Sequence, residues 1–321
     1  MPVRMKDIAH NLGLSQTTVS HVLRGREAEF RIGAETANRV RAAARRLRYH
    51  PSALARNLKH HRSYTLALAV DDLTNPFWAG LAVAAQQEAE QHGYMLVVNQ
   101  TAESLAKERH LLEMLRQKRV DGLILSAAHL RPVDLAALRE ESRPLVLVDR
   151  TIDGLDFPHV VTDSIAGVRL GVDHLVAKGH RRIAFLGGPR YMSTFRDRLA
   201  GYRRAMAAHR LRPGPHIVAQ AAPGPAQRAA RRLFEQGGTK PTAVIAANIW
   251  LTIGALRGTP DQVEIVGFDD IYLADMLRRP VTTIAQPVEE LGRQAVRLLL
   301  ETVGKPATNH KVVLAPQLIV R

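Results

Sequence analysis

The chain has 321 residues, 46% of them hydrophobic, and its 45 lysines and arginines against 30 aspartates and glutamates leave a formal net charge of +15. The absence of cysteine excludes disulfides, thiolate chemistry and zinc held by cysteines. No apolar run reaches the roughly 18 residues of a membrane span, and the first residues lack the apolar stretch of a secretory signal, so we expect a cytoplasmic protein.

The positive charge is concentrated near the start of the chain. Residues 1–62 hold 13 lysines and arginines but only 4 acidic residues. Such a concentration suits a polyanion, either nucleic acid or an acidic membrane surface. A generally basic composition is the alternative, because arginine is frequent throughout the chain.

Three helices are predicted in this basic segment, over residues 5–12, 16–23 and 34–47. Gly13 suits a tight turn between the first two helices, and Ser15 suits the N-cap of the second. Apolar residues recur at core spacing in each helix. Two short helices joined by a tight turn, with a third to support them, form a helix-turn-helix.

The second helix has two different faces, since each residue advances by about 100°. Val19, Val22 and Leu23 share the apolar face. The opposite face carries donors, acceptors and a cation, from Gln16, Thr17, Ser20, His21 and Arg24. The major groove of DNA displays complementary donor and acceptor patterns. An ordinary solvated face would more often carry glutamate and lysine.

After the third helix comes "RYHPSALARNLKHHRS", residues 48–63. Pro51 suits the first turn of a helix, and Leu54 and Leu58 lie one turn apart. The segment is too short to be stable alone, so we expect it to fold only when docked.

At this point the sequence resembles the LacI/GalR family of bacterial transcriptional regulators. "MKDIAHNLGLSQTTVSHVLRG" is similar to the family's headpiece and "HPSALARNL" to its hinge helix. The resemblance implies that bases are read by Gln16, Thr17 and His21 and that phosphates are gripped by Ser15, Thr18 and Ser20. It also implies a minor-groove wedge at Leu58, with Ala55 and Arg56 beside it. The loop "RGREAEFRIGAET" is longer than usual, so the resemblance does not define its contacts.

Residues 63–321 alternate strands with helices. Strand-like apolar runs lie at 65–72, 94–100, 121–127, 144–150, 159–163, 182–188, 216–220, 242–248 and 263–270. Helical stretches lie at 76–92, 103–118, 164–179, 193–210 and 226–236. This order predicts parallel, doubly wound sheets covered on both faces, in two lobes because the strands exceed one comfortable sheet. Ligands of such sheets bind at the carboxyl ends of the strands.

The family resemblance extends over this part through blocks such as "NPFW", "RVDGLIL", "KGHRRIAFLGGP", "VGFDD" and "TTIAQPVEELG". It implies a two-lobed, periplasmic-binding-protein-like effector domain. The effector-binding residues it implies are Phe77 and Trp78 flanking the ligand, Arg196 as the main charged clamp, Asp149, Asn248 and Asp269 as polar partners, and Ser126 and Gln286 at the lip.

Each of these assignments has a plainer alternative. Trp78 fits the core of a lobe, and Arg196 could pair with Asp197 on a helix surface. Asp149 could be held by Arg150, and Asp269 or its neighbour Asp270 could cap a short helix that follows.

Two departures from the family pattern weaken the assumption of a common sugar ligand. Ile249 and Trp250 follow "AAN" where the family usually has aspartate, and the 254–263 region is shortened. The sequence up to Arg321 shows no heptad extension, so we expect a dimer without a tetramerising tail.

The expected organisation is a helix-turn-helix headpiece at 1–49, a hinge helix at 50–62 and a two-lobed ligand-binding and dimerisation domain at 63–321. The expected function is that of a homodimeric repressor that binds a near-palindromic operator in double-stranded DNA, with a sugar or related metabolite between the lobes altering its affinity. A solute-binding protein for transport is the alternative, but it would lack a basic headpiece. No enzyme motif occurs, and we expect no cofactor, metal or membrane partner.

Overall fold

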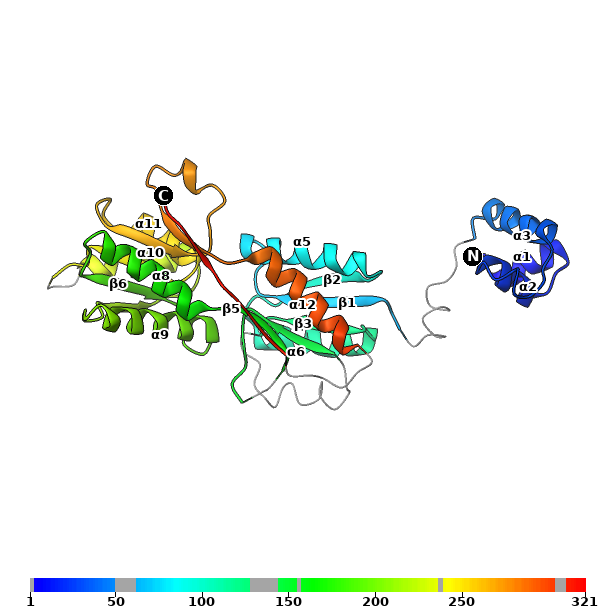
Figure 1. The fold of residues 1–321 in the computed structure, drawn as a ribbon, viewed down its shortest axis with the longest axis horizontal. Coiled ribbons are helices and arrows are strands. Elements are labelled where there is room, and N and C mark those ends of the chain that lie inside the picture. Colours follow the sequence, from blue (N-terminus) through cyan, green and yellow to red (C-terminus); the bar gives the residue numbers. More distant parts are fainter. Residues whose placement is uncertain (1–2, 50–61, 128–143, 155–156, 236–238, 304–309) are drawn as a thin grey trace. The chain divides into compact units, whose positions relative to one another are not determined.

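The computed structural model describes all residues except 1–2, 50–61, 128–143, 155–156, 236–238 and 304–309 (Figure 1). Contacts divide the chain into two compact units, Met1–Ser63 and Tyr64–Arg321. Almost all of the expected hinge helix, including Ala55, Arg56 and Leu58, lies outside the described residues.

The first unit consists of the helices α1 (Met5–Leu12), α2 (Gln16–Leu23) and α3 (Ala34–Arg46), as the sequence predicts. Each helix contributes to one core that includes Ile8, Val19 and Val40. Gly13 closes α1 with a φ of 66°, and the backbone N–H of Leu14 donates to the Ala9 carbonyl at 2.9 Å. This left-handed termination makes the tight turn into α2 possible.

The second unit contains two sheets with the same strand order. The first sheet runs β11-β5-β4-β3-β1-β2 and the second runs β12-β10-β9-β8-β6-β7 among the described strands. All neighbours are parallel except β10 and β12. The first sheet comprises β1 (Thr65–Val70), β2 (Met95–Gln100), β3 (Gly122–Leu125), β4 (Leu145–Val148), β5 (His159–Thr162) and β11 (Lys311–Leu314). The second comprises β6 (Ile183–Gly187), β7 (His216–Val218), β8 (Ala243–Ala246), β9 (Glu264–Phe268), β10 (Thr282–Ala285) and β12 (Gln317–Ile319).

Helices cover both faces of the first sheet, which forms the first lobe (Figure 1). The helices α5 (Pro76–Gln91) and α12 (Val288–Thr302) cover one face, and α6 (Leu105–Lys118) covers the other. Strand β1 is apolar throughout because both of its faces are covered. Leu66 and Leu68 join the core under α5 and α12, whereas Ala67 joins the core under α6. Side chains alternate along a strand, so a sheet that is covered twice needs apolar residues at every position.

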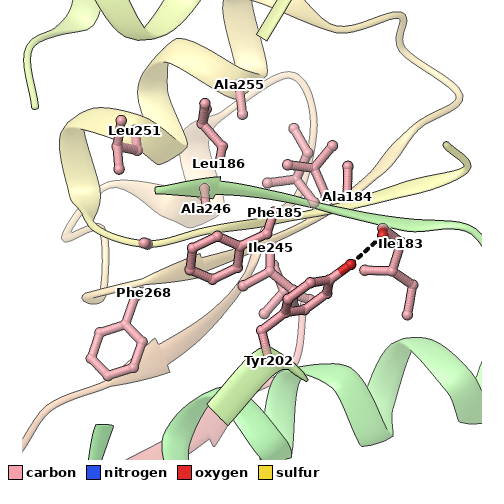
Figure 2. Close-up of a cluster of buried hydrophobic side chains, with 14 of the residues drawn as sticks. Ile183, Ala184, Phe185, Leu186, Tyr202, Ile245, Ala246, Leu251, Ala255 and Phe268 are labelled. Atoms are coloured by element: carbon pink, nitrogen blue, oxygen red, sulfur yellow. Dashed lines mark hydrogen bonds between the residues drawn. The ribbon is translucent and has the colours of Figure 1, made fainter. Parts of the chain in front are cut away.

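The second lobe is built on the second sheet with α8 (Ser164–Ala177), α9 (Ser193–Ala208), α10 (Pro223–Glu235) and α11 (Ile249–Gly258). A short 3-10 helix, η1, spans Ala274–Met276. Figure 2 shows Tyr202 of α9 beneath the sheet, where its hydroxyl donates to the Ile183 carbonyl at 2.7 Å. Burial raises the pKa of Tyr202 to about 12, so the hydroxyl stays protonated and anchors α9 to β6.

The described chain passes between the two sheets three times, after β5, after β10 and between β11 and β12. Each lobe is therefore assembled from segments that come from distant parts of the sequence. This architecture confirms the fold class expected from the sequence, namely a helix-turn-helix headpiece and two doubly wound lobes. Within the described residues, none of the helices combines the length and apolar character that a membrane crossing requires.

Candidate DNA-reading surface and effector cleft

The polar residues of α2 lie together on the face opposite the small core. Gln16, Thr17 and Arg24 are exposed, and Ser20 and His21 are partly exposed. Val19 and Val22, on the other face, are buried. The helix therefore presents donors and acceptors outward from a rigid apolar base, which is the geometry that reading a groove requires.

The start of α2 is held by two of the predicted phosphate-binding residues. The Ser15 hydroxyl accepts the backbone N–H of Thr18 at 3.0 Å, and the two hydroxyl oxygens lie 2.8 Å apart. Ser15 is thus the N-cap, as the sequence predicts. This cap fixes the first turn of α2. The N-terminus of a helix is a favourable place for a phosphate to bind.

In the second unit, predicted site residues follow equivalent strands of the two sheets. Asp149 follows β4 and Asp269 follows β9, and these strands hold the same position in their sheets. Both residues have a left-handed backbone, with φ values of 65° and 73°. Aspartate tolerates this conformation better than most residues, but the strain still costs free energy and is typical of functional sites. Ser126 and Asn248 also follow equivalent strands of the two sheets, β3 and β8.

One of the buried cations near these carboxylates is Arg198, on α9. Its side chain is only 3% exposed, its Nη1 donates to the Ala247 carbonyl at 2.7 Å, and its guanidinium carbon lies 3.7 Å from the centroid of the Phe268 ring. Burial lowers the pKa of Arg198, while the charges of Asp269 and Asp149 act in the opposite direction. Arg198 therefore brings a desolvated positive charge to the ends of β8 and β9.

Arg196 lies elsewhere. Its guanidinium forms two hydrogen bonds to the Asp153 carboxylate, at 2.6 and 3.0 Å, and its Nε lies 3.7 Å from Asp197. Its side chain is 35% exposed. The structure thus joins Arg196 to surface carboxylates, including the Asp197 considered as its alternative partner, and does not bring it to Asp149 and Asp269.

A signal in the sequence distinguishes the two arginines. The buried residues of α9 include Phe195, Leu199, Tyr202 and Met206, which recur at helical spacing. Arg198 falls within this apolar stripe, and position 196 falls outside it. The periodicity of α9 therefore identifies Arg198 as the arginine that faces the interior.

Asp149 belongs to a buried cluster of charges. Arg150 forms an ion pair with Asp71, and its Nε lies 3.5 Å from Asp149 Oδ2. Burial raises the pKa of Asp149 to about 6, although the charges of Arg150 and Arg198 oppose the rise. At neutral pH this carboxylate is ionised, but it costs free energy to keep it so.

Phe77 and Trp78 lie at the start of α5, where the Asn75 side chain caps the helix by accepting the Phe77 N–H at 3.0 Å. They are 7% and 3% exposed and belong to the core of the first lobe. Their ring centroids are 4.7 Å apart in an edge-to-face arrangement. Trp78 is therefore a core residue, and the Arg150 guanidinium carbon lies 6.0 Å from its ring centroid.

Three of the polar residues expected in the cleft already have partners. Asn248 Oδ1 caps α11 by accepting the Leu251 N–H at 2.9 Å. Asp269 accepts the Ile249 N–H at 3.2 Å and the Gln286 side-chain amide at 2.6 Å. The expectation that Asp269 or Asp270 caps the next short helix is wrong, because Leu273 is the N-cap of η1 and has no side-chain cap. Asp270 instead accepts hydrogen bonds from Thr283 and Arg321.

Among the residues expected in the cleft, two have a buried oxygen without a hydrogen-bond partner within the described chain, namely Ser126 Oγ and Gln286 Oε1. Ser126 is fully buried and Gln286 is 8% exposed. Buried polar atoms are almost always hydrogen-bonded in folded proteins. These two oxygens are therefore groups that a bound hydroxyl or amine would satisfy.

A cleft of about 560 Å³ opens between strand ends of the two lobes. The first lobe lines it with Asp71, Asp72, Gln100 and Glu103, and the second with Tyr191 and Gln220, among others. The volume is that of an ordinary small-molecule site. Its described lining includes the carboxylates of Asp72, Glu103 and Asp71, the last of which is paired with Arg150, and none of the effector-binding residues expected from the sequence. The excess of carboxylates in this lining favours a neutral or cationic ligand over an anionic one.

Comparisons with known proteins agree with this architecture. The profile of bacterial regulatory proteins of the lacI family matches residues 4–52, and that of the periplasmic binding protein-like domain matches residues 172–321. The ribose operon repressor of Escherichia coli strain K12 is 34% identical, over 99% of this chain and 98% of that protein. The HTH-type transcriptional repressor PurR of Aliivibrio salmonicida is 31% identical, over 99% of this chain and 97% of that protein.

Among solved structures, the lac repressor dimer bound to operator and an anti-inducer is similar with a TM-score of 0.88. It is 27% identical to this chain, and the match covers 100% of this chain and 98% of that one. Similarity that spans the headpiece and both lobes supports regulation over transport as the role of the shared fold. The chain belongs to the LacI family of bacterial regulatory proteins.

Proposed function

We propose that this DNA-binding regulator is a dimeric repressor whose affinity for a near-palindromic operator changes when a small hydroxylated molecule binds between its lobes. The observation that carries the proposal is the convergence of Asp149, Asp269 and Arg198 at the strand ends, in a chain that also carries the polar face of α2. The named relatives are repressors, and the lac repressor structure is a dimer bound to its operator. Because operator DNA is its proposed partner, we propose that the protein works in the cytoplasm.

On DNA, Gln16, Thr17 and His21 would read base edges from α2, with Arg24 at the end of the same face. Ser15, Thr18 and Ser20 would contact phosphates and set the register of the helix. The hinge residues Ala55, Arg56 and Leu58 would enter the minor groove at the centre of the operator, where an apolar wedge kinks the duplex.

For the effector site at the strand ends, we assign the charged clamp to Arg198 in place of Arg196. Its guanidinium is desolvated and oriented by the Phe268 ring, which suits a planar grip on neighbouring hydroxyls. Asp149, Asp269 and Asn248 would bind further hydroxyls, and Ser126 and Gln286 would use their unpartnered oxygens. Phe77 and Trp78 would support the ligand from the core beneath it.

The charge of the cleft narrows the class of effector. Asp72 and Glu103 line the cleft together with Asp71, whose charge Arg150 offsets, so a phosphorylated sugar would meet repulsion there. A neutral sugar offers hydroxyls that carboxylates and arginine bind well. We therefore propose an unphosphorylated sugar, bound without turnover, and the ribose operon repressors among the relatives make a pentose the first to test.

The test has two stages. Bound sequences are first selected from random duplex DNA with the full-length protein at a stated salt concentration, because phosphate contacts make affinity salt-dependent. A two-fold-symmetric motif is expected, and enrichment of no motif would contradict operator binding. Operator affinity is then measured with ribose, ribose 5-phosphate and adenine. Ribose is expected to change it, and a response only to ribose 5-phosphate or adenine would refute the neutral-sugar assignment.

A further inference from the structure

The loop between α2 and α3, which is longer than is usual in the family, has a defined conformation tied to both helices. The Arg26 N–H donates to the His21 carbonyl at 3.0 Å, and the Ile32 N–H donates to the Glu27 carbonyl at 2.9 Å. Glu27 also forms an ion pair with Arg41 of α3. The first contact joins the start of the loop to the C-terminal end of α2, the second closes the loop on itself, and the third joins it to α3.

Phe30 is the large apolar side chain that this loop presents, and it is 44% exposed. Its ring is stacked on the imidazole of His21, with 3.5 Å between ring centroids and 22° between ring planes. The Arg26 guanidinium carbon lies 5.2 Å from the same phenyl centroid, and Arg26 is itself held by Glu29. An exposed phenylalanine outside the core of the headpiece thus lies on one residue of the polar face of α2.

We propose that Phe30 is a specificity-determining residue that acts by positioning His21. A histidine on a helix surface can rotate about both side-chain torsions, so its two ring nitrogens sample several directions. A ring stacked at 3.5 Å restricts those rotations and directs the edge of the imidazole away from the phenyl face. His21 would then meet its base pair in a single orientation, and donors held in advance lose less freedom on binding.

This inference rests on the proposed role of α2 in reading the operator, but it concerns a residue outside α2. It predicts that removal of the phenyl ring relaxes the base preference at the positions that His21 reads, by about 5- to 10-fold in the ratio of preferred to disfavoured base. Affinity for nonspecific DNA should not change, because no charge is removed.

The experiment compares the full-length protein with Phe30→Ala, Phe30→Tyr, His21→Ala and the double variant, by selection from random duplex DNA and by thermal unfolding. His21→Ala identifies the base pairs that depend on His21. Phe30→Ala should relax the preference at those same pairs and at no others. Phe30→Tyr, which keeps a stacked ring, should restore it, and Phe30→Ala should have no further effect when His21 is already alanine.

Two results would overturn the inference while leaving operator binding intact. One is a base preference for Phe30→Ala that equals that of the unmodified protein. The other is an even loss of preference at every position together with a lower Tm, which would mean that Phe30 only stabilises the headpiece. If the unmodified protein itself enriches no motif, the proposed function fails and this inference fails with it.

Discussion

The guanidinium of Arg198 lies on the face of Phe268, 3.7 Å from its ring centroid, at the point where β9 ends and Asp269 begins. One helix and one strand of the second lobe thus hold a buried cation beside the carboxylates of both lobes. The cation–π contact and the bond to the Ala247 carbonyl fix the orientation of the guanidinium before any ligand arrives.

Substitution of Arg198 should therefore abolish the effector response. Arg198→Ala removes a buried charge that would bond the ligand, and such losses cost about 2–5 kcal/mol, or at least roughly 30-fold in effector Kd. Isothermal titration with the effector measures the loss, and operator affinity without effector should stay near its original value.

Arg196→Ala is the matched control, since it removes the same side chain two residues away on the same helix. It should retain the response with only a small loss of affinity. If the effector response survives Arg198→Ala but disappears in Arg196→Ala, then Arg196 is the main charged contact to the effector.

The ion pair between Arg196 and Asp153 joins α9 of the second lobe to the segment after β4 of the first. The Thr151 N–H donates to Ser193 in the same place, at 3.0 Å. The pair is partly exposed, so its effect on unfolding should stay within about 1 kcal/mol. Because it links the lobes, Asp153→Asn should speed effector dissociation by up to about 5-fold in stopped-flow measurements, and salt should reduce the difference.

Asp197→Asn is the control for this pair, because Asp197 is on the same helix as Arg196 and cannot link the lobes. Equal dissociation rates for Asp153→Asn and the unmodified protein would show that the ion pair does not hold the lobes together.

Asp149 should make the protein less stable as pH rises from about 4 to about 6. Burial raises the pKa of Asp149 from an ordinary 3.8 to about 6, so the folded state binds this proton more tightly than the unfolded state does in that window. By linkage, the contribution of Asp149 to the free energy of unfolding falls by an amount of order 2–3 kcal/mol as pH rises through this window. Above it, the contribution levels off. Arg150, Arg198, Asp71 and Asp269 are the charges that act on it.

Urea unfolding of the unmodified protein and of Asp149→Asn between pH 4 and 7.5 checks this prediction. The asparagine variant cannot ionise there, so the difference between the two free energies of unfolding isolates the residue. A difference that does not vary with pH would contradict the raised pKa.

Glu88 of α5 is a buried carboxylate whose main partner comes from α12. It accepts hydrogen bonds from Arg297 at 2.8 and 3.2 Å, which lower its pKa together with a bond from His92. Arg297→Ala would remove the main compensating partner of this carboxylate and should lower the Tm by a few degrees at pH 7. Because the folded pKa is lowered, the stabilisation is present above the unfolded pKa and is lost as pH falls through the folded pKa.

Arg293→Ala is the matched control on the same helix. Arg293 pairs with Glu289 and Glu290, its neighbours along α12, so its loss should change the Tm little. Equal Tm changes for the two variants would show that the ion pair between α5 and α12 stabilises the protein no more than the pairs within α12.

Local patterns in the sequence determined much of this protein. The helices of the headpiece and strands β1 to β9 were predicted because periodicity, caps and turn residues act over a few positions. The strands β10, β11 and β12 were missed: β10 is half threonine, and the other two are short and partly exposed, so none shows a long apolar run. Helices α11 and α12 were missed although both are regular.

Tertiary structure alone decided which polar groups meet. The periodicity of α9 indicates that Arg198 and not Arg196 faces the interior, but only the packing of α9 against the sheet brings Arg198 onto Phe268 and Arg196 to Asp153. Asp149 and Asp269 hold equivalent positions because the two sheets have the same strand order. Phe30 stacks on His21 because the turns of its loop bring it back to α2. The physical reason is that desolvation and close contact depend on neighbours distant in the chain, whereas the tendency to form a helix or strand depends on neighbours in sequence.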